Sequence, residues 1–134
     1  RERGRPKDRR ARLVLANHVS WLDIPVIGSL RPLSFVAKSE IEGWPLVGRL
    51  ATLQRTIFIE RARKSATAEV NGEVAARLRR GEAVVLFPEG TTGDGNRLLP
   101  FRSSIIGAAR AALTGSQTES ILLQPLAIAY VRRN

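Results

Sequence analysis

The chain contains a single histidine, His18, and an aspartate, Asp23, stands five positions after it. A histidine whose imidazole ring is oriented by a carboxylate is a common general base. The pair follows a short apolar run at 13–16, which predicts a buried strand that ends just before the histidine. We therefore expect a strand-to-helix loop whose turn brings Asp23 back to His18.

Asp23 also has two purely structural interpretations. Ser20 as N-cap with Asp23 three positions later forms a helix capping box. Asp23 as N-cap instead places Pro25 in the first helical turn, where proline is tolerated. A single histidine is itself often structural, so the spacing alone leaves catalysis and capping open.

Length and composition set the class of protein. A chain of 134 residues with 43% hydrophobic and 25% charged residues is typical of one globular domain. The absence of cysteine excludes disulfides and thiolate metal sites, and one histidine disfavours structural zinc. We expect no metal and no cofactor. Methionine is absent even at position 1, which favours an excerpt of a longer protein.

The net charge of +10 is concentrated at the start of the chain. Residues 1–12 hold seven basic residues against two acidic ones. We expect a flexible basic arm at 1–11, followed by a single domain at 12–134. Such an arm suits anionic lipid headgroups or nucleic acid, and the alternative is a solvated terminus.

Strand and helix patterns alternate along the chain. Strands are predicted at 13–16, 33–37, 56–60, 83–87 and 121–131, the last interrupted by Pro125. Helices are predicted at 22–30, 64–80 and 103–113, with a buried helical turn at 46–53. The alternation predicts an α/β fold: a single domain with a mostly parallel central sheet flanked by helices.

Polar residues follow three of the predicted strands: His18, Arg61 and Glu89 with Gly90. Because the carboxyl ends of parallel strands share one edge of a sheet, we expect the active site at that edge. Arg61 offers a fixed cation for phosphate or carboxylate. Glu89 offers an acceptor for a substrate hydroxyl or headgroup.

The loop at 88–96 contains three glycines, Gly90, Gly93 and Gly95. Glycine lets backbone amides approach an anion or an oxyanion closely. The chain has neither cysteine nor a Gly-x-Ser-x-Gly sequence, so no covalent nucleophile is indicated. Direct transfer, in which His18 deprotonates an acceptor hydroxyl, is the simplest chemistry that these groups offer.

The sequence Asn-His-Val-Ser-Trp-Leu-Asp at 17–23, followed by Phe-Pro-Glu-Gly-Thr at 87–91, resembles the phospholipid/glycerol acyltransferases. Two further blocks are similar to that family, Ile-Phe-Ile-Glu-Arg at 57–61 and Leu-Gln-Pro-Leu-Ala at 123–127. The resemblance spans about residues 12–131.

The resemblance implies that His18 is the general base and Asp23 its orienting partner. The acceptor hydroxyl would attack the thioester of acyl-CoA or acyl-carrier protein. The acceptor headgroup would be held by Arg61, Glu89, Gly90 and Thr91, and Lys38 matches a lysine that often lines the acyl tunnel. The acceptor first expected is 1-acyl-glycerol-3-phosphate, giving phosphatidic acid in phospholipid biosynthesis.

One position departs from the family pattern. The arginine that usually follows Phe-Pro-Glu-Gly-Thr is Thr92 here, which removes one candidate phosphate contact. In this the chain resembles bacterial enzymes that acylate lyso-ornithine lipid, an acceptor without phosphate. Arg61 and Arg102 remain as cations for a phosphate. The resemblance also implies an anionic membrane surface as partner, at the cytoplasmic face of the bacterial inner membrane.

Three other functions stay open on the sequence. A basic module could bind nucleic acid or membrane without catalysis, but 5% aromatic content and the lack of an RNA-binding motif lead us to expect no nucleic-acid partner. A hydrolase would use His18 and Asp23 to activate water. A family member that has lost its activity would keep the fold alone.

Overall fold

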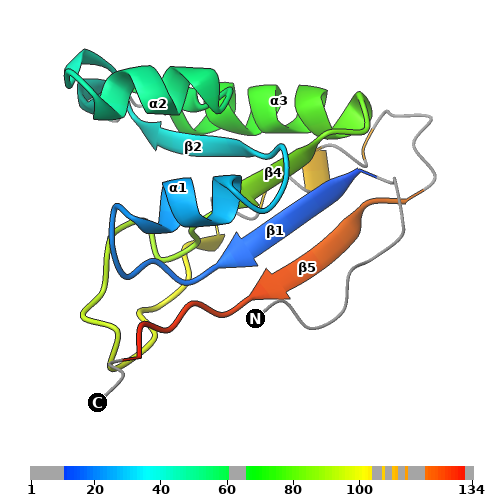
Figure 1. The fold of residues 1–134 in the computed structure, drawn as a ribbon. Coiled ribbons are helices and arrows are strands. Elements are labelled where there is room, and N and C mark those ends of the chain that lie inside the picture. The colour runs from blue at the N-terminus through cyan, green and yellow to red at the C-terminus, as the bar shows by residue number, and fades with distance from the viewer. Residues whose placement is uncertain are drawn as a thin grey trace.

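The computed structural model describes residues 11–60, 66–103, 107, 110–111, 114 and 120–131. Figure 1 shows their order along the chain: β1 (Arg12–Ala16), α1 (Asp23–Gly28), β2 (Ser34–Lys38), the 3-10 helix η1 (Ser39–Gly43), α2 (Val47–Leu53), β3 (Ile57–Ile59), α3 (Ala66–Arg79), β4 (Ala83–Leu86) and β5 (Leu122–Leu126). The basic arm expected at 1–11 lies, except for Ala11, outside the described residues, as does most of the helix expected at 103–113.

The strands form one sheet in the order β3-β2-β4-β1-β5, and every pair of neighbours is parallel. This confirms the predicted α/β fold with a parallel central sheet. Leu13 of β1 lies opposite Val84 of β4 and Leu123 of β5. The loop after β1 therefore emerges between the chain segments that follow β4 and β5, which is the arrangement that builds the site.

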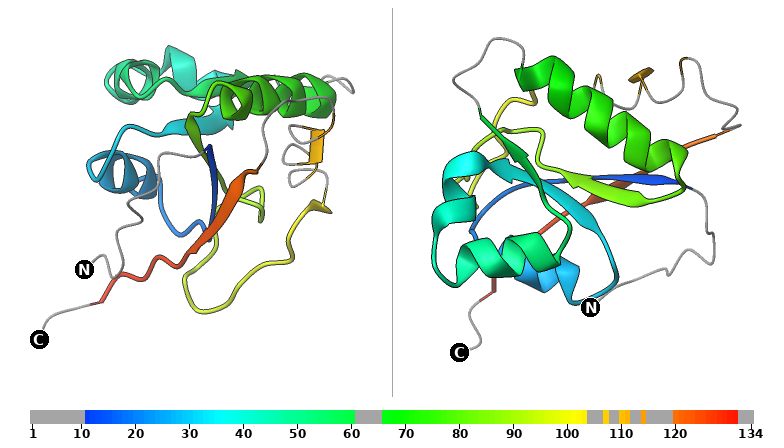
Figure 2. Two further views of the ribbon diagram at one scale, coloured as in Figure 1. Left: turned by 90° about the vertical axis from the view of Figure 1, so that its right-hand side faces the viewer. Right: turned by 90° about the horizontal axis from the view of Figure 1, so that it is seen from above.

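Helices cover both faces of the sheet, and Figure 2 shows α3 on one side with α1 and α2 on the other. Successive side chains of a strand point to opposite faces, so adjacent residues of β1 enter different cores. One core joins the strands to α3 (Leu13, Ile57, Val74, Ala75, Leu78, Val84 and Leu86). The other joins them to α1 (Val14, Ala16, Ile27, Leu33, Phe35, Val85 and Phe87). Each fully buried aliphatic side chain contributes about 1.5–3 kcal/mol.

The helix α2 is not the buried turn that its apolar sequence predicts. Leu46, Leu50 and Leu53 are exposed, and the buried residues of the helix are the small Gly48 and Ala51. Small residues bring the helix backbone close to the domain, which turns the large side chains outward. Apolar content alone therefore misjudged which side of this segment is covered.

Pro125 does not interrupt the last strand as expected. It lies inside β5 opposite Leu15. Proline lacks a backbone N–H, but β5 is an edge strand with a neighbour on one side only, where a missing donor is tolerated. The strand therefore runs through Pro125 and carries the chain on towards the loop after β1.

Candidate active site

The carboxylate of Asp23 organises the loop that follows β1. Its Oδ2 atom accepts hydrogen bonds from the backbone amides of Val19 at 2.8 Å and Ser20 at 3.0 Å, and lies 2.8 Å from Nδ1 of His18. Asp23 itself is fully buried. One oxygen thus closes the turn and holds the imidazole ring at the same time.

The interpretation of Asp23 as the N-cap is wrong, and the capping box is only half formed, because the amide of Ser20 donates to Oδ2 of Asp23 at 3.0 Å. The N-cap of α1 is Leu22, and within the described residues no side chain caps the helix. The hydroxyl of Ser20 accepts the amide of Leu22 at 3.2 Å rather than a donor inside the helix. Asp23 is the first helical residue, and its side chain points back to the loop instead of along α1.

Tyr130, from the segment after β5, completes the contacts of this carboxylate. Its hydroxyl donates to Oδ1 of Asp23 at 2.6 Å. Burial acts to raise the pKa of Asp23, but hydrogen bonds from Ser20, Tyr130, Val19 and His18 outweigh it and lower the pKa below its ordinary value. Burial and the contact with Asp23 raise the pKa of Tyr130 to about 12, so its hydroxyl stays protonated and keeps donating.

The ring of His18 is held from two sides. It stacks on Phe87, with ring centroids 4.1 Å apart and planes inclined by 21°. Since Nδ1 faces the anionic Asp23, the hydrogen bond assigns the proton to Nδ1 and leaves the lone pair on Nε2. The side chain retains 16% of its exposure, so the basic nitrogen belongs to a ring that a substrate can reach.

Glu89 acts as a clamp between two loops. Its Oε1 accepts the amide of His18 at 2.9 Å and its Oε2 accepts the amide of Leu99 at 2.8 Å. The residue is 4% exposed, so this carboxylate is buried with both oxygens engaged by backbone amides. Its geometry gives Glu89 a positioning role, while the expected contact with a headgroup stays a prediction.

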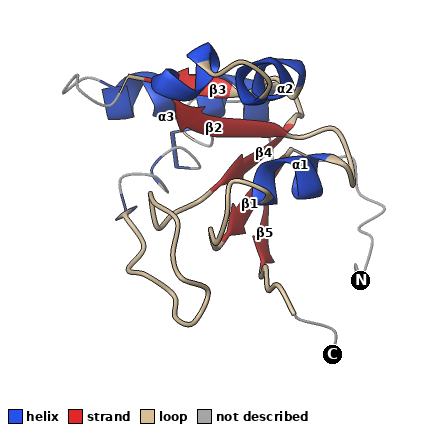
Figure 3. Ribbon diagram, turned by 60° about the vertical axis from the view of Figure 1, so that its left-hand side comes forward, coloured by secondary structure: helices blue, strands red, loops and turns tan. Residues whose placement is uncertain are grey.

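The glycine-rich loop lies against the histidine loop, as Figure 3 shows for the connections after β4 and β1. The amide of Gly93 donates to the carbonyl of His18 at 2.7 Å, and the amide of Gly90 donates to the carbonyl of Phe87 at 3.0 Å. The amide of Gly93 therefore joins the two loops, and that of Gly90 closes a turn within its own loop; the expected contact of the glycine amides with an anion stays a prediction.

Gly90 has a left-handed backbone, with φ of 71°, and a side chain packs directly over it. A Cβ atom at this position would lie 3.0 Å from Nε and 3.1 Å from Cδ of Arg102. The amide of Arg102 also donates to the carbonyl of Pro88 at 2.8 Å. The structure thus brings Arg102, one of the two cations expected for a phosphate, to the Glu-Gly-Thr turn.

For the remaining predicted residues, the structure gives at most a position along the chain and in the sheet. Thr91 is exposed in the loop directly after Gly90. Lys38 ends β2 and lies opposite Ile59 in the sheet register, on a strand two places from β1. Arg61 lies outside the described residues. Their substrate contacts stay predictions.

Asn17 and Tyr130 were not expected at the site, although each follows a strand at the shared edge of the sheet. The side chain of Asn17 donates to the carbonyl of Ile128 at 2.9 Å and accepts its amide at 2.6 Å. These bonds fasten the segment after β5 to the loop after β1. The strand predicted at 121–131 contains Tyr130, whereas β5 ends at Leu126, so the shared-edge rule points to Tyr130 only once that end is known.

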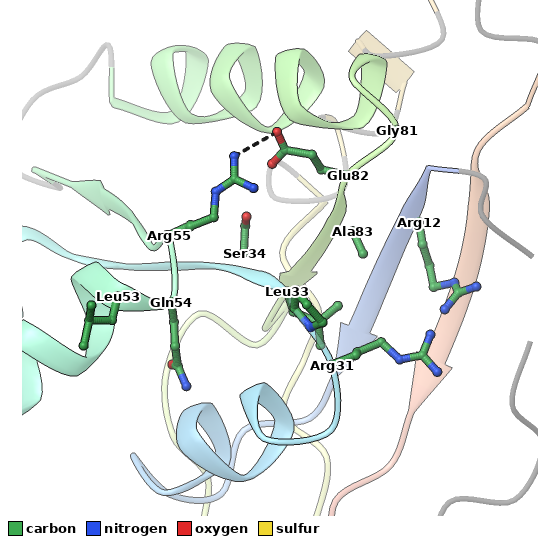
Figure 4. A pocket seen from close by; sticks show the side chains of 11 residues that line it. Arg12, Arg31, Leu33, Ser34, Leu53, Gln54, Arg55, Gly81, Glu82 and Ala83 are labelled. Atoms are coloured by element: carbon green, nitrogen blue, oxygen red, sulfur yellow. Dashed lines mark hydrogen bonds and ion pairs between the residues drawn. The ribbon is translucent and has the colours of Figure 1, made fainter.

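A cavity of about 520 Å³ lies at the opposite edge of the sheet. It is lined by the first residues of three strands, Arg12, Ser34 and Ala83, together with Arg31 and Arg55 (Figure 4). Neither His18 nor Asp23 lines it. The cavity and the His18–Asp23 pair therefore lie at different ends of the domain. Within the described ranges, no three metal-binding side chains come together.

Comparison with known proteins gives a consistent result. The chain is 50% identical over 120 residues to a lyso-ornithine lipid O-acyltransferase of Brucella abortus, and 52% identical over 124 residues to one of Rhizobium meliloti. These matches cover 90% and 92% of this chain, which spans 45% and 42% of the relatives' lengths. A 1-acyl-sn-glycerol-3-phosphate acyltransferase of Neisseria gonorrhoeae is 42% identical over 97 residues, covering 72% of this chain and 38% of that protein.

A solved structure has the same fold. The crystal structure of the 1-acyl-sn-glycerophosphate acyltransferase PlsC of Thermotoga maritima matches 92% of this chain and 56% of that one, with a TM-score of 0.64 and 28% identity. The model of the Acyltransferase family matches residues 3–129, almost the whole chain. The chain therefore belongs to the Acyltransferase family.

Proposed function

We propose that the protein transfers a fatty acyl group from a thioester donor to the free hydroxyl of a lysolipid. The observation that carries this proposal is the contact of 2.8 Å between Nδ1 of His18 and the buried Asp23, which leaves Nε2 as a base. The names of the relatives agree with the reaction class.

The reaction follows from that pair. Nε2 of His18 takes the proton of the acceptor hydroxyl as its oxygen attacks the thioester carbonyl carbon. The resulting tetrahedral intermediate collapses by breaking the C–S bond, and the departing thiolate takes the proton from the imidazolium. Asp23 stabilises the imidazolium between the two steps, and the products are the ester and the free thiol.

Lyso-ornithine lipid is the acceptor that we favour. The two relatives near 50% identity carry this acceptor in their names, and Thr92 stands where the phospholipid/glycerol acyltransferases usually have an arginine. The second candidate is 1-acyl-glycerol-3-phosphate. It is favoured by the Neisseria relative and by the guanidinium of Arg102 over Gly90, which suits a phosphate.

The donor and the place of action belong to the same proposal. We infer acyl-CoA or acyl-carrier protein as donor, and an anionic membrane surface at the cytoplasmic face of the bacterial inner membrane. The net charge of +10 supports attraction to anionic lipid. Trp21 and Leu22, exposed by 58% and 42%, place apolar surface beside the histidine loop. Among the described residues, no helix has the length and hydropathy to span a bilayer.

A thiol-release assay on the full-length protein tests the proposal. Acyl-CoA and acyl-carrier protein are each offered with lyso-ornithine lipid, with 1-acyl-glycerol-3-phosphate, or without acceptor, and His18→Ala is run in parallel. We expect release that depends on lyso-ornithine lipid and is lost in the variant. Release without acceptor would identify a thioesterase. No release under any condition would overturn the catalytic proposal.

A further inference from the structure

We propose that Tyr130 is a positioning residue of the acyl-transfer site, which acts through Asp23 on the general base His18. This inference rests on the function proposed above. The reaction itself requires only the histidine and its carboxylate, so the contribution of Tyr130 is a separate question with its own test.

The contacts of Asp23 are divided between its two oxygens. Oδ2 faces three N–H groups, those of His18, Val19 and Ser20. In the part of the chain that the structure describes, the hydroxyl of Tyr130 is the side-chain donor directed at Oδ1, at 2.6 Å. Because Asp23 is fully buried, water has no access to replace this donor without a rearrangement.

Two anchors deliver Tyr130 to this position. The sheet holds β5 against β1, with Ala16 opposite Leu126. Ile128 lies two residues beyond the strand, and the side chain of Asn17 forms hydrogen bonds with its backbone carbonyl and amide. Asn17 precedes His18, so the same loop that carries the base also fixes the segment that brings Tyr130.

The hydroxyl has one function that its ring does not share. The residue is 51% exposed, so most of the ring contributes little packing, whereas the oxygen reaches a buried carboxylate. Holding Oδ1 fixes the plane of the carboxylate, and that plane sets the direction from which Oδ2 holds Nδ1 of His18. Loss of the hydroxyl frees the carboxylate to turn and the imidazole to leave its reactive orientation.

The test is a double-mutant cycle on kcat in the full-length protein, with acyl-carrier protein and lyso-ornithine lipid as substrates. The variants are Tyr130→Phe, Asp23→Asn and the two combined, each checked for folding by circular dichroism and thermal unfolding. We expect Tyr130→Phe to lower kcat about tenfold with KM within about twofold, since it removes a hydrogen bond to a charged group and no substrate contact. In the Asp23→Asn background the same change should cost less than about twofold.

Two controls complete the cycle. Leu123→Ala alters an exposed side chain of β5 and should leave kcat unchanged. His18→Ala separates the two levels of the proposal: if it keeps turnover, the proposed function fails and the inference with it.

The inference alone is overturned by either of two results in a protein whose His18→Ala variant is inactive. One is a Tyr130→Phe variant with the kcat of the wild type. The other is a full additional loss of kcat in the Asp23→Asn background, because that would place the action of Tyr130 outside the carboxylate. If the first result came with a raised KM, Tyr130 would be a substrate contact instead.

Discussion

The two edges of the sheet differ in how completely they hydrogen-bond a carboxylate. We call the edge at the carboxyl ends of the strands the carboxyl edge, and the opposite one the amino edge. At the carboxyl edge, each oxygen of Asp23 accepts hydrogen bonds, and each oxygen of Glu89 accepts one from a backbone amide. At the amino edge, Oε1 of Glu82 pairs with Arg55 and Arg80, while its buried Oε2 has no hydrogen-bond partner among the described residues.

The amino edge nevertheless contains the cavity of about 520 Å³, and the carboxyl edge contains the proposed catalytic pair, His18 and Asp23. General-base catalysis needs a histidine held in one orientation, and the saturated hydrogen bonds of Asp23 and Glu89 supply that order. The cavity is lined by arginine side chains and Glu82, and supplies volume without a histidine. Preorganised polar contacts therefore identify this site better than cavity size does.

The largest expected effect comes from removing the base. His18→Ala should lower kcat about a hundredfold to ten-thousandfold, the usual contribution of a positioned general base. The fold should survive, because the ring is partly exposed and packs on one side against Phe87. Thiol release measures the rate, and thermal unfolding measures the fold. If His18→Ala kept a turnover close to that of the wild type, the carboxyl edge would not contain the base.

Breaking the Glu89 clamp should affect both activity and stability. Glu89→Gln replaces one acceptor oxygen by an NH₂ group that faces a backbone N–H, so the amide of His18 or Leu99 loses its partner. An unpaired buried amide costs about 1–3 kcal/mol, which corresponds to several degrees in Tm. We expect kcat to fall as well, since the amide of His18 lies in the catalytic loop.

Glu73→Gln is the matched control for that prediction. Glu73 is 44% exposed and pairs with Arg77 one helical turn away. Arg77 is only 14% exposed, but it keeps its hydrogen bonds to Ser34 and to the carbonyl of Arg55 in the variant. Pairs one helical turn apart contribute about 0.3–0.5 kcal/mol, so Tm should hardly change and kcat should stay constant. If both variants lost stability equally, burial of the Glu89 carboxylate would not be the cause.

The sequence predicted the parts of this site that depend on local pattern. The apolar strand before His18, the turn that returns Asp23 and the shared edge with Glu89 all follow from spacing and from the parallel sheet. Tyr130 and Asp23 are 107 residues apart, and Asn17 and Ile128 are 111 apart. No periodicity connects such pairs, because their distance depends on how the complete sheet folds.

The direction in which a side chain points was also beyond the sequence. The sequence offered Glu89 as an acceptor for a headgroup, but did not show that its oxygens accept amides from two loops. The apolar residues of α2 were expected inside, yet Gly48 and Ala51 are the ones that pack. In both cases the residue type was compatible with two environments, and long-range packing selected one.

Acid should weaken the carboxyl edge through Asp23. Burial would raise the pKa of this carboxyl, but its hydrogen bonds lower it below the ordinary value of 3.8. The native state therefore binds the proton less readily than the unfolded chain. The ionised Asp23 therefore stabilises the native state fully above pH 3.8, and this stabilisation is lost as the pH falls through the lower native pKa of Asp23.

Urea unfolding between about pH 2 and 5 measures this loss as a slope of unfolding free energy against pH. Asp23→Asn should make the slope shallower without abolishing it, because the pKa of Glu82 is also lowered. Burial acts against that shift, and hydrogen bonding to Arg80 with the charges of Arg55, Arg80 and Arg77 outweighs it. Glu82→Gln should flatten the slope too, but leave kcat unchanged. A loss of kcat there would contradict the comparison of the edges.

Two glycines with left-handed backbones allow a smaller and more discriminating test. A Cβ atom added to Gly81, with φ of 77°, would meet no described atom within 4 Å, whereas one added to Gly90, with φ of 71°, would meet Arg102. Alanine in this conformation costs about 1–2 kcal/mol at either position. Since the side chain of Arg102 is exposed and can move, the two stability losses should be similar. Only Gly90→Ala should reduce turnover, and equal turnover would show that the turn tolerates displacement.

The smallest effect is expected at the cavity, from Arg55. Its backbone has φ of 55°, because it follows α2 in the left-handed turn that closes the helix, where the amide of Thr56 donates to the carbonyl of Ala51 at 3.1 Å. Its side chain is 65% exposed and pairs with Glu82 at 3.2 Å, a contact worth about 0–1 kcal/mol. Arg55→Ala removes the ion pair and keeps the strained backbone, whereas Arg55→Gly removes both.

Glycine should therefore be the more stable of the two variants by about 1 kcal/mol, as measured by urea unfolding. Neither variant should change kcat, because the cavity lies at the amino ends of the strands and the base at their carboxyl ends. A fall in turnover in both variants would tie the cavity to catalysis and break the separation of the two edges. A fall in the glycine variant alone would instead trace the effect to the backbone after α2.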